Sequence, residues 1–177
     1  MSAARPVNDL RIRPAAEGDL PAVMDLFHAL AALQAPWRVF TPRPNLREEM
    51  RRRYQADVAD PDALLVVAEQ DGGIVGMASG HLHKPSSMSE ELAVELGSVY
   101  VRPEYRDRGV AAALTAEVAQ FARERGVRRI TLKTFAQNEE ALVAWQRMGF
   151  EPRMVQLTAS VDRIQKLDRA SRRRAGR

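Results

Sequence analysis

One stretch of the sequence, residues 95–125, combines a strand, a basic turn and a helix start, and it constrains the fold more than any other. Residues 95–101 alternate in polarity and are rich in Val and Tyr, which is typical of a strand. Pro103 ends that strand, because proline has no backbone N–H to donate to a sheet. A basic turn containing Gly109 follows, and an Ala-rich run with apolar residues at helical spacing comes after it. The free N–H groups and the dipole of the first helical turn would both face an anion held by this turn.

The composition excludes several classes of protein. A chain of 177 residues, 45% apolar and 28% charged, predicts one globular domain with a buried core. The absence of cysteine excludes disulfides, thiolate zinc sites and a cysteine nucleophile. No apolar run approaches the roughly 18 residues that a membrane helix needs, and the N-terminus lacks the apolar segment of a signal peptide. We therefore expect a cytoplasmic enzyme or binding protein with no membrane partner.

The net charge of +4 is unevenly distributed along the chain. Residues 163–177 hold six Arg, one Lys and one Asp, a net charge of +6, so the remaining residues together carry −2. We expect residues 1–9 to be disordered, residues 10–162 to fold, and residues 163–177 to form a basic tail. A nucleic-acid-associated function through this tail is one alternative. The acidic body offers no continuous basic face in support, so nucleic acid is not the expected partner.

Alternation, helical spacing and turn residues predict the other elements. In chain order they are a strand at 10–13, a helix capped by Asp19, a loop at 35–44, a helix capped by Asn45 that ends near Asp57, strands at 64–69 and 74–83 joined by an Asp71-Gly72-Gly73 hairpin turn, the strand at 95–101, a helix closed by Gly126, a strand at 129–134, a helix from Asn138 to Gly149, and one or two strands at 150–159. Glu48, three residues after Asn45, predicts a capping box. This order, β-α-α-β-β-β-α-β-α-β, predicts an α/β (α+β) fold with a mixed central sheet flanked by helices.

The chain resembles the GNAT family of acetyl-CoA-dependent N-acetyltransferases over roughly residues 10–160. The family signature is Arg/Gln-x-x-Gly-x-Gly/Ala after a strand that ends in Val-x-Pro. The sequence has Arg106 to Ala111 in this place, preceded by Val101-Arg102-Pro103. The predicted element order also matches that of the family. The resemblance implies an acyltransferase that moves the acetyl group of acetyl-CoA to a primary amine by direct attack in a ternary complex.

The resemblance also implies where coenzyme A binds. Backbone N–H groups of the turn would hold the pyrophosphate, Gly109 and Ala111 would let the backbone approach it closely, and the arginines of the turn would add positive charge. The pantetheine arm would pair with the exposed backbone of Val99 and Val101 like an added strand. Asn138 would contact that arm or only cap its own helix. The expected cofactor-binding residues are Val99, Tyr100, Val101, Arg106, Asp107, Arg108, Gly109, Val110, Ala111, Ala112 and Asn138.

Glu95 is the candidate catalytic base. The amine must lose a proton before it attacks, and a carboxylate beside the thioester can take that proton, often through water. Several family members use a glutamate at this spacing before Val-x-Pro, so the resemblance implies this role for Glu95. The alternative is a structural glutamate at the start of the strand. Strand alternation places Glu95 and Val101 on one sheet face and Tyr100 on the other.

The group that protonates the leaving thiolate is not evident from the sequence. Many family members carry a tyrosine for this purpose seven residues after the helix-capping asparagine. This chain has Trp145 there, and indole has no proton to give at neutral pH. Either another group supplies the proton or the thiolate leaves without one. The departure keeps open an alternative function, a non-catalytic CoA-binding sensor or partner-binding module.

The acceptor is an unidentified small-molecule or peptide amine. The family binds its acceptor between the first two helices and the later strands, where this chain has Trp37, Phe40 and Tyr54; these aromatics suit an amine or serve only as loop anchors. His81 and His83 share a strand face and could line the acceptor pocket. A metal site is not expected, because no third histidine lies close in sequence. A homodimer is compatible with the resemblance, since members of the family often dimerise.

Overall fold

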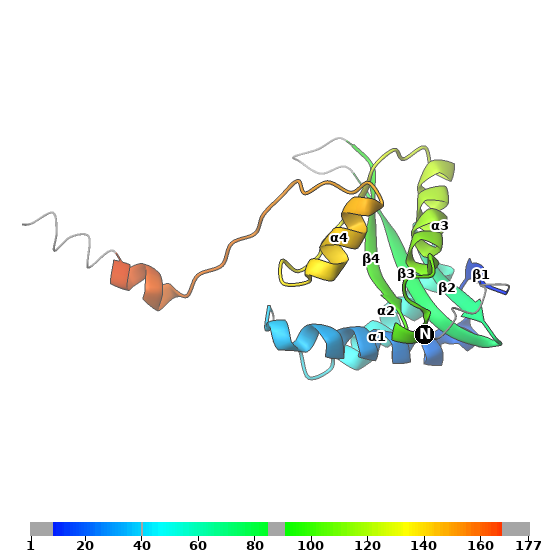
Figure 1. Cartoon of the computed structure of the whole chain (residues 1–177), viewed down its shortest axis with the longest axis horizontal. Coiled ribbons are helices and arrows are strands. Elements are labelled where there is room, and N and C mark those ends of the chain that lie inside the picture. The colour runs from blue at the N-terminus through cyan, green and yellow to red at the C-terminus, as the bar shows by residue number, and fades with distance from the viewer. Residues whose placement is uncertain (1–8, 40, 85–90, 168–177) are drawn as a thin grey trace, which may run out of the picture. The chain divides into compact units, whose positions relative to one another are not determined.

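The computed structural model describes residues 9–39, 41–84 and 91–167 (Figure 1). It divides into two units, residues 1–139 and residues 140–177, which are described separately. In the described part of the chain, no helix is both long and apolar enough to cross a membrane.

The first unit is built on a five-stranded sheet, and the sheet is mixed, as the sequence predicts. The strands lie in the order β1 (Arg11–Pro14), β2 (Ala63–Gln70), β3 (Gly73–His83), β4 (Ala93–Val101) and β5 (Ile130–Leu132). Neighbouring strands are antiparallel except β4 and β5, which are parallel. The predicted hairpin joins β2 to β3, where Asp71 and Gly72 have φ angles of 53° and 75°. Two consecutive positive φ angles are the signature of a type I′ turn, which matches the twist of the strands that it joins.

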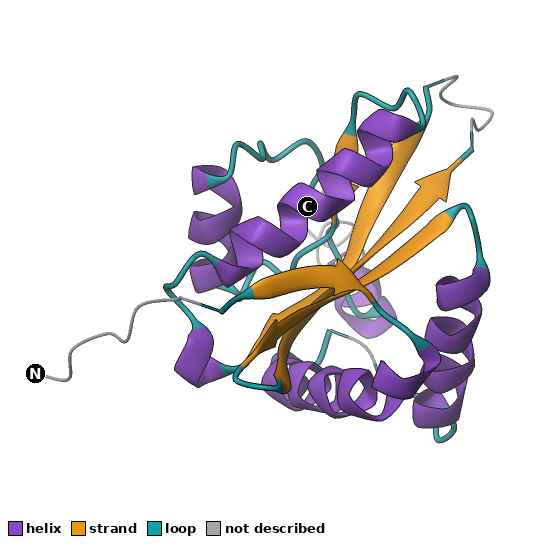
Figure 2. Cartoon of the chain, turned by 90° about the vertical axis from the view of Figure 1, so that its right-hand side faces the viewer, coloured by secondary structure: helices purple, strands orange, loops and turns teal. Residues whose placement is uncertain are grey.

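Helices cover both faces of the sheet (Figures 1 and 2). Helices α1 (Leu20–Gln34) and α2 (Leu46–Ala59) pack on one face, and α3 (Val110–Glu124) packs on the other. The α1/α2 face is filled by a cluster of buried residues that includes Leu26, Tyr54, Leu65, Val67, Met77 and Tyr100. On the α3 face, two glycines of β3 bring the helix close. A Cβ at Gly80 would lie 2.9 Å from Cγ1 of Val118, and one at Gly76 would lie 3.3 Å from Cδ1 of Leu114.

The predicted helix ends are confirmed in part. Gly126 has a φ of 70°, and the next residue, Val127, donates its N–H to the Ala122 carbonyl at 2.9 Å, which closes α3 as expected. The capping box of α2 is wrong. The Asn45 side chain donates to Glu49 at 2.7 Å, whereas Glu48 accepts from Arg52 one turn further on. A charged partner on the exposed helix surface competes with the backbone cap for that glutamate.

The second unit holds most of α4 (Glu139–Arg147) and the C-terminal segment. Gly149 follows the helix with a φ of 91°, and Phe150 donates its N–H to the Trp145 carbonyl at 3.0 Å, so the helix ends where predicted. The one or two strands predicted at 150–159 are wrong, because these residues form no regular structure and residues 161–167 are helical. Met154 is 90% exposed and Leu157 87% exposed. Alternating apolar residues form a strand only where a neighbouring strand pairs with them and other residues bury their apolar face.

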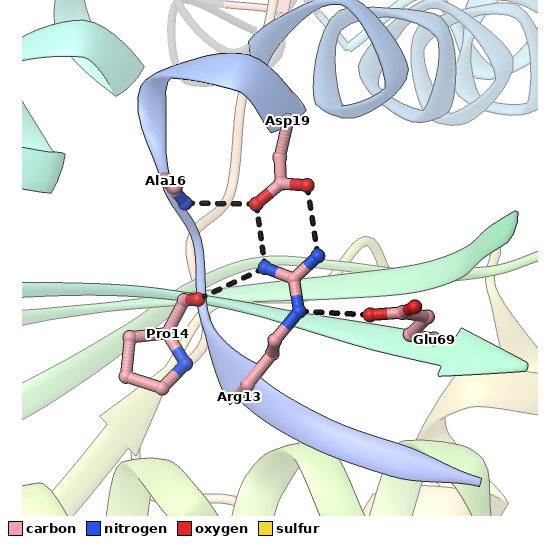
Figure 3. Close-up of polar contacts among 5 residues, drawn as sticks. All are labelled: Arg13, Pro14, Ala16, Asp19 and Glu69. Atoms are coloured by element: carbon pink, nitrogen blue, oxygen red, sulfur yellow. Dashed lines mark hydrogen bonds and ion pairs between the residues drawn. The ribbon is translucent and has the colours of Figure 1, made fainter. Parts of the chain in front are cut away.

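Arg13 joins β1, the segment before α1, and β2 (Figure 3). Its guanidinium donates two hydrogen bonds to Asp19, at 2.6 and 2.9 Å, and its Nε donates to Glu69 at 2.8 Å. The Asp19 carboxylate also accepts the N–H of Ala16 at 2.8 Å, so it caps this turn and makes no side-chain cap to α1. The hydrogen bonds from Arg13 hold the pKa of Asp19 below its usual value.

We expect Arg13→Ala to lower the free energy of unfolding at pH 7 by about 2 kcal/mol, because it leaves two part-buried carboxylates without their donor. The difference between wild type and variant should shrink in acid. The pKa of Asp19 is lowered by folding, so its stabilising contribution is complete above its unfolded pKa, about 3.9, and is lost as the pH falls through the lower folded value. Urea unfolding from pH 7 to pH 3 measures this. Arg11→Ala, at an exposed position of the same strand, is the control, and an equal loss in both variants contradicts the assignment.

Candidate functional site

A β-bulge in β4 is the central feature of the site. Ala78 pairs with Val99 and Gly80 pairs with Leu96, so Gly97 and Ser98 together face the single residue Ser79. The Ser98 N–H donates to Oγ of Ser79 at 3.0 Å, which replaces a ladder bond at this point. A Cβ at Gly97 would lie only 2.6 Å from the same oxygen, so a larger residue there would displace the hydroxyl that accepts the Ser98 N–H.

The bulge reverses the predicted orientation of side chains along β4. Glu95 pairs with His81 and shares its face of the sheet, which is covered by α1 and α2. Beyond the bulge, Tyr100 belongs to the buried cluster on that same face, whereas Val101 lies beside Gly76 on the α3 face. The predicted faces of Val101 and Tyr100 relative to Glu95 are therefore wrong. One extra residue shifts the two-residue period of the strand, and every later side chain changes face.

Beyond the bulge, the described chain places no neighbouring strand beside β4 on the β5 side, so the sheet has an open edge there. Strand β5 pairs with β4 only at Val94–Leu96, and no strand among the described residues pairs with 97–101 on that side. Arg102 donates its N–H to β3, at the Val75 carbonyl (2.9 Å), so the N–H and C=O groups of Val99 and Val101 point the other way. The Val101 carbonyl accepts Nε of Arg106 at 3.1 Å. An extended ligand could pair with the groups that remain, as an added strand does.

The turn after β4 and the start of α3 form a cluster of backbone donors. A 3₁₀ turn, η3 (Pro103–Tyr105), leads to Asp107 and Gly109, which have φ angles of 57° and 78°. In the described part of the chain, the first α3 residue that donates its N–H to the turn is Ala113, which bonds to the Gly109 carbonyl at 2.9 Å. The N–H groups before it, including those of Val110, Ala111 and Ala112, belong to the helix end that has no intrahelical acceptor. No atom lies within 4 Å of a Cβ built at Gly109, so the space over this turn is open to an anion.

The three arginines of the turn point to different partners. Arg106 and Arg108 lie over the rings of Tyr100 and Tyr105, with Cζ 5.6 and 5.7 Å from the ring centroids. These contacts hold both guanidinium groups against aromatic rings of the same segment. Arg102 turns away and donates to the Ile74 carbonyl at 3.2 Å. Of the three, Arg106 and Arg108 are the ones whose guanidinium groups do not turn back to β3.

A polar cluster lies on the α1/α2 face of β3 and β4. The Glu95 carboxylate lies 3.0 Å from Nζ of Lys133 and 3.5 Å from Nε2 of His83. Beside it, Nε2 of His81 lies 3.0 Å from the carboxylate of Asp57 on α2, whose side chain is 8% exposed. Sequence reasoning finds Glu95 and both histidines but misses Asp57 and Lys133, which come from a helix and from the residue after β5.

Tyr54 links α2 to the bulge by a hydrogen bond. Its hydroxyl donates to Oγ of Ser98 at 2.9 Å, and burial raises its pKa to about 12. With 1% of its surface exposed, Tyr54 belongs to the buried core on the α1/α2 face. Trp37 lies against Phe135, with ring centroids 5.6 Å apart, and Phe40 is outside the described residues.

Two further residues singled out by the sequence lie at either end of α4. Asn138 directly precedes the helix and donates its N–H to the Phe135 carbonyl at 2.9 Å. Trp145 packs edge-on against Phe150, with ring centroids 5.6 Å apart, in the second unit. Among the described residues, no group of three or more His, Asp or Glu side chains is arranged to hold a metal ion.

The bulge was missed by the sequence analysis, although a signal for it exists. Gly97 interrupts a run of strand-forming residues, and a glycine inside a strand often marks a bulge or a close backbone approach. Ser79 and Ser98 are ordinary serines in the sequence. Only the register of the two strands brings them together.

Known proteins of one family are similar to this chain. The family model described as the acetyltransferase (GNAT) family matches residues 29–150. An uncharacterized N-acetyltransferase of Escherichia coli, YjgM, is 31% identical over 136 residues, covering 75% of this chain and 77% of that protein. Human N-acetyltransferase 8 is 30% identical over 129 residues, covering 72% of this chain and 56% of that protein.

Solved structures share the fold. A predicted acetyltransferase from Clostridium acetobutylicum, crystallised with acetyl-CoA, superposes with a TM-score of 0.69 at 16% identity, covering 86% of this chain and 97% of that one. The chain spans 38 to 56% of the length of the first curated relatives that it matches.

Proposed function

Because the chain belongs to the acetyltransferase (GNAT) family, we propose that it transfers the acetyl group of acetyl-CoA to a primary amine. The observation that carries this proposal is the path formed by the open edge of β4 at Val99, the turn that follows it and the N–H groups of the first turn of α3. An extended amide-containing arm and the pyrophosphate at its end match the two parts of that path, the open edge and the N–H groups. Coenzyme A has both groups.

The residues along this path would hold acetyl-CoA. In this proposal the N–H groups of Asp107 to Ala112 bind the pyrophosphate, with Arg106 and Arg108 adding positive charge. Val99 and the N–H of Val101 pair with the pantetheine arm. Tyr100 acts indirectly, since its backbone faces β3 and its ring supports Arg106. Asn138 is proposed as a further contact of the arm.

The proposed reaction is a direct attack in a ternary complex. Acetyl-CoA supplies an activated thioester carbonyl, and the bound amine attacks it with coenzyme A as the leaving thiol. Glu95 is the proposed catalytic base. Its carboxylate lies on the sheet face opposite α3, just before the bulge, where it would attract an ammonium group and take its first proton.

We expect Glu95→Gln to lower kcat/KM for the amine at least tenfold while the Kd for coenzyme A stays within twofold, because the amide cannot accept the proton. A thiol-release assay with acetyl-CoA across amine classes identifies an acceptor, and calorimetry measures coenzyme A binding. Glu91→Gln, a glutamate before the start of β4, is the matched control. Unchanged turnover in the Glu95 variant contradicts the assignment of the base.

A non-catalytic CoA-binding module is the alternative, and the same two measurements separate it from an enzyme. Such a module binds coenzyme A but releases no thiol with any amine. A chain that neither binds coenzyme A nor releases thiol contradicts both functions.

A further inference from the structure

We propose that His81 carries a proton from the acceptor nitrogen to the leaving sulfur, and that Asp57 is the positioning residue that orients it. This inference rests on the proposed acetyl transfer and adds a residue that the family resemblance does not assign. It also supplies the acid that is missing at Trp145.

Asp57 fixes the orientation of the His81 ring. Its carboxylate is almost fully buried and lies 3.0 Å from Nε2 of His81. A buried carboxylate needs a donor, so it favours the ring form that carries its proton on Nε2. The other nitrogen, Nδ1, then has its lone pair free. The described residues provide no other hydrogen bond to this ring.

The free nitrogen faces the bulge. A Cβ built at Gly97 would lie 3.8 Å from Nδ1 of His81. Because glycine has no Cβ, the space beside this nitrogen is not filled by residue 97. His81 and Glu95 are directly paired across β3 and β4, so their side chains lie side by side. The His81 side chain is 19% exposed and is therefore accessible from this face. A thioester placed on the open edge beyond the bulge would lie next to both residues.

The stoichiometry of the reaction requires two proton removals from nitrogen. An ammonium group loses one proton before attack and a second as the amide forms, while the sulfur gains one. Glu95 takes the first. The neutral amine forms a C–N bond to the thioester carbonyl carbon, and the π electrons of that carbonyl move to its oxygen. An N–H bond of the attached nitrogen then breaks, its electron pair stays on nitrogen, and the proton binds Nδ1 of His81. As the carbonyl re-forms, the C–S bond breaks with its electron pair going to sulfur, and the proton moves from Nδ1 to that sulfur to give the free thiol.

Asp57 stabilises the imidazolium that forms between these two steps, as a carboxylate does for a histidine that works as both base and acid. Other ionisable groups that the described residues place on this face are Glu95 of β4, His83 of β3, and Lys133 after β5, whose Nζ lies 3.0 Å from the Glu95 carboxylate. Lys133 forms an ion pair with Glu95. Asp57 is the carboxylate in direct contact with the His81 ring.

His81→Gln tests the proposal, because glutamine can still donate to Asp57 but cannot carry a proton. We expect kcat for the identified amine to fall about tenfold or more, with the Kd for coenzyme A within twofold and the melting temperature nearly unchanged. The limb of the pH–rate profile that reports histidine deprotonation should disappear. His28→Gln, at a histidine of α1 that lies beside Phe27, is the matched control and should behave as wild type.

A second measurement does not depend on activity. Long-range ¹H–¹⁵N spectra at pH 8 should find the His81 proton on Nε2, and Asp57→Asn should weaken that preference and lower kcat. A proton on Nδ1, or a His81→Gln variant with wild-type rate and pH profile, overturns the proposal while acetyl transfer itself stands. Absence of turnover by the wild-type chain with every amine overturns the proposed function, and this inference with it.

Discussion

Gly109→Val is expected to weaken the binding of coenzyme A at least 100-fold, or about 2.7 kcal/mol, while the chain still folds. Gly109 has a φ of 78°, a conformation that a β-branched residue rarely adopts. Valine would therefore move the turn to another conformation and redirect the N–H groups of 107–112. Its side chain would also occupy the open space over the turn, where no protein atom lies within 4 Å of a Cβ. Calorimetric titration with coenzyme A measures the loss.

The chain offers a closely matched control for this prediction. Gly72, in the hairpin between β2 and β3, has a φ of 75° and likewise has no atom within 4 Å of a built Cβ. Gly72→Val should carry the same conformational strain, about 1–2 kcal/mol of stability, without any effect on coenzyme A binding. Equal affinities in the two variants would place the pyrophosphate site elsewhere.

Gly97→Ala is expected to lower kcat/KM at least 100-fold and to destabilise the fold by about 2 kcal/mol. The added Cβ would lie 2.6 Å from Oγ of Ser79, the atom that accepts the Ser98 N–H. Relief of this clash breaks that hydrogen bond and shifts the bulge. The shift moves the open edge at Val99 relative to Glu95 and His81, and small displacements of reacting groups have large effects on rate.

Two variants separate the loss of geometry from a simple loss of stability. Gly80→Ala places a Cβ 2.9 Å from Cγ1 of Val118 on the opposite face of the sheet, so it should destabilise the fold to a similar extent. At a temperature where both variants are folded, it should keep near-wild-type kcat/KM. Ser79→Ala in the Gly97→Ala background removes the clashing oxygen and should recover part of the stability. Full activity in Gly97→Ala shows that the bulge does not position the reaction.

Local sequence features predict most of the first unit because its signals act over short range. The Asp71-Gly72 turn, the Gly126 helix end and the Gly109 turn depend on backbone conformations that glycine and a few other residues adopt readily. The cluster of N–H donors at the start of α3 is also predictable from local sequence, because it needs only a strand, a turn and a helix start in succession. The strands predicted at 150–159 are wrong because a strand needs partners that its own sequence does not contain.

The sequence by itself determined the mixed α/β fold, the positions of nearly all helices and strands in the first unit, and the turn of backbone donors at Gly109. Tertiary structure alone decided which side chains meet. The register of β3 against β4 created the bulge at Gly97 and Ser98, and so reversed the faces of Tyr100 and Val101 relative to Glu95. It also brought Asp57 from α2 onto His81. The reason is physical: turn and helix signals lie within a few residues, whereas pairing register and helix packing depend on contacts between distant parts of the chain.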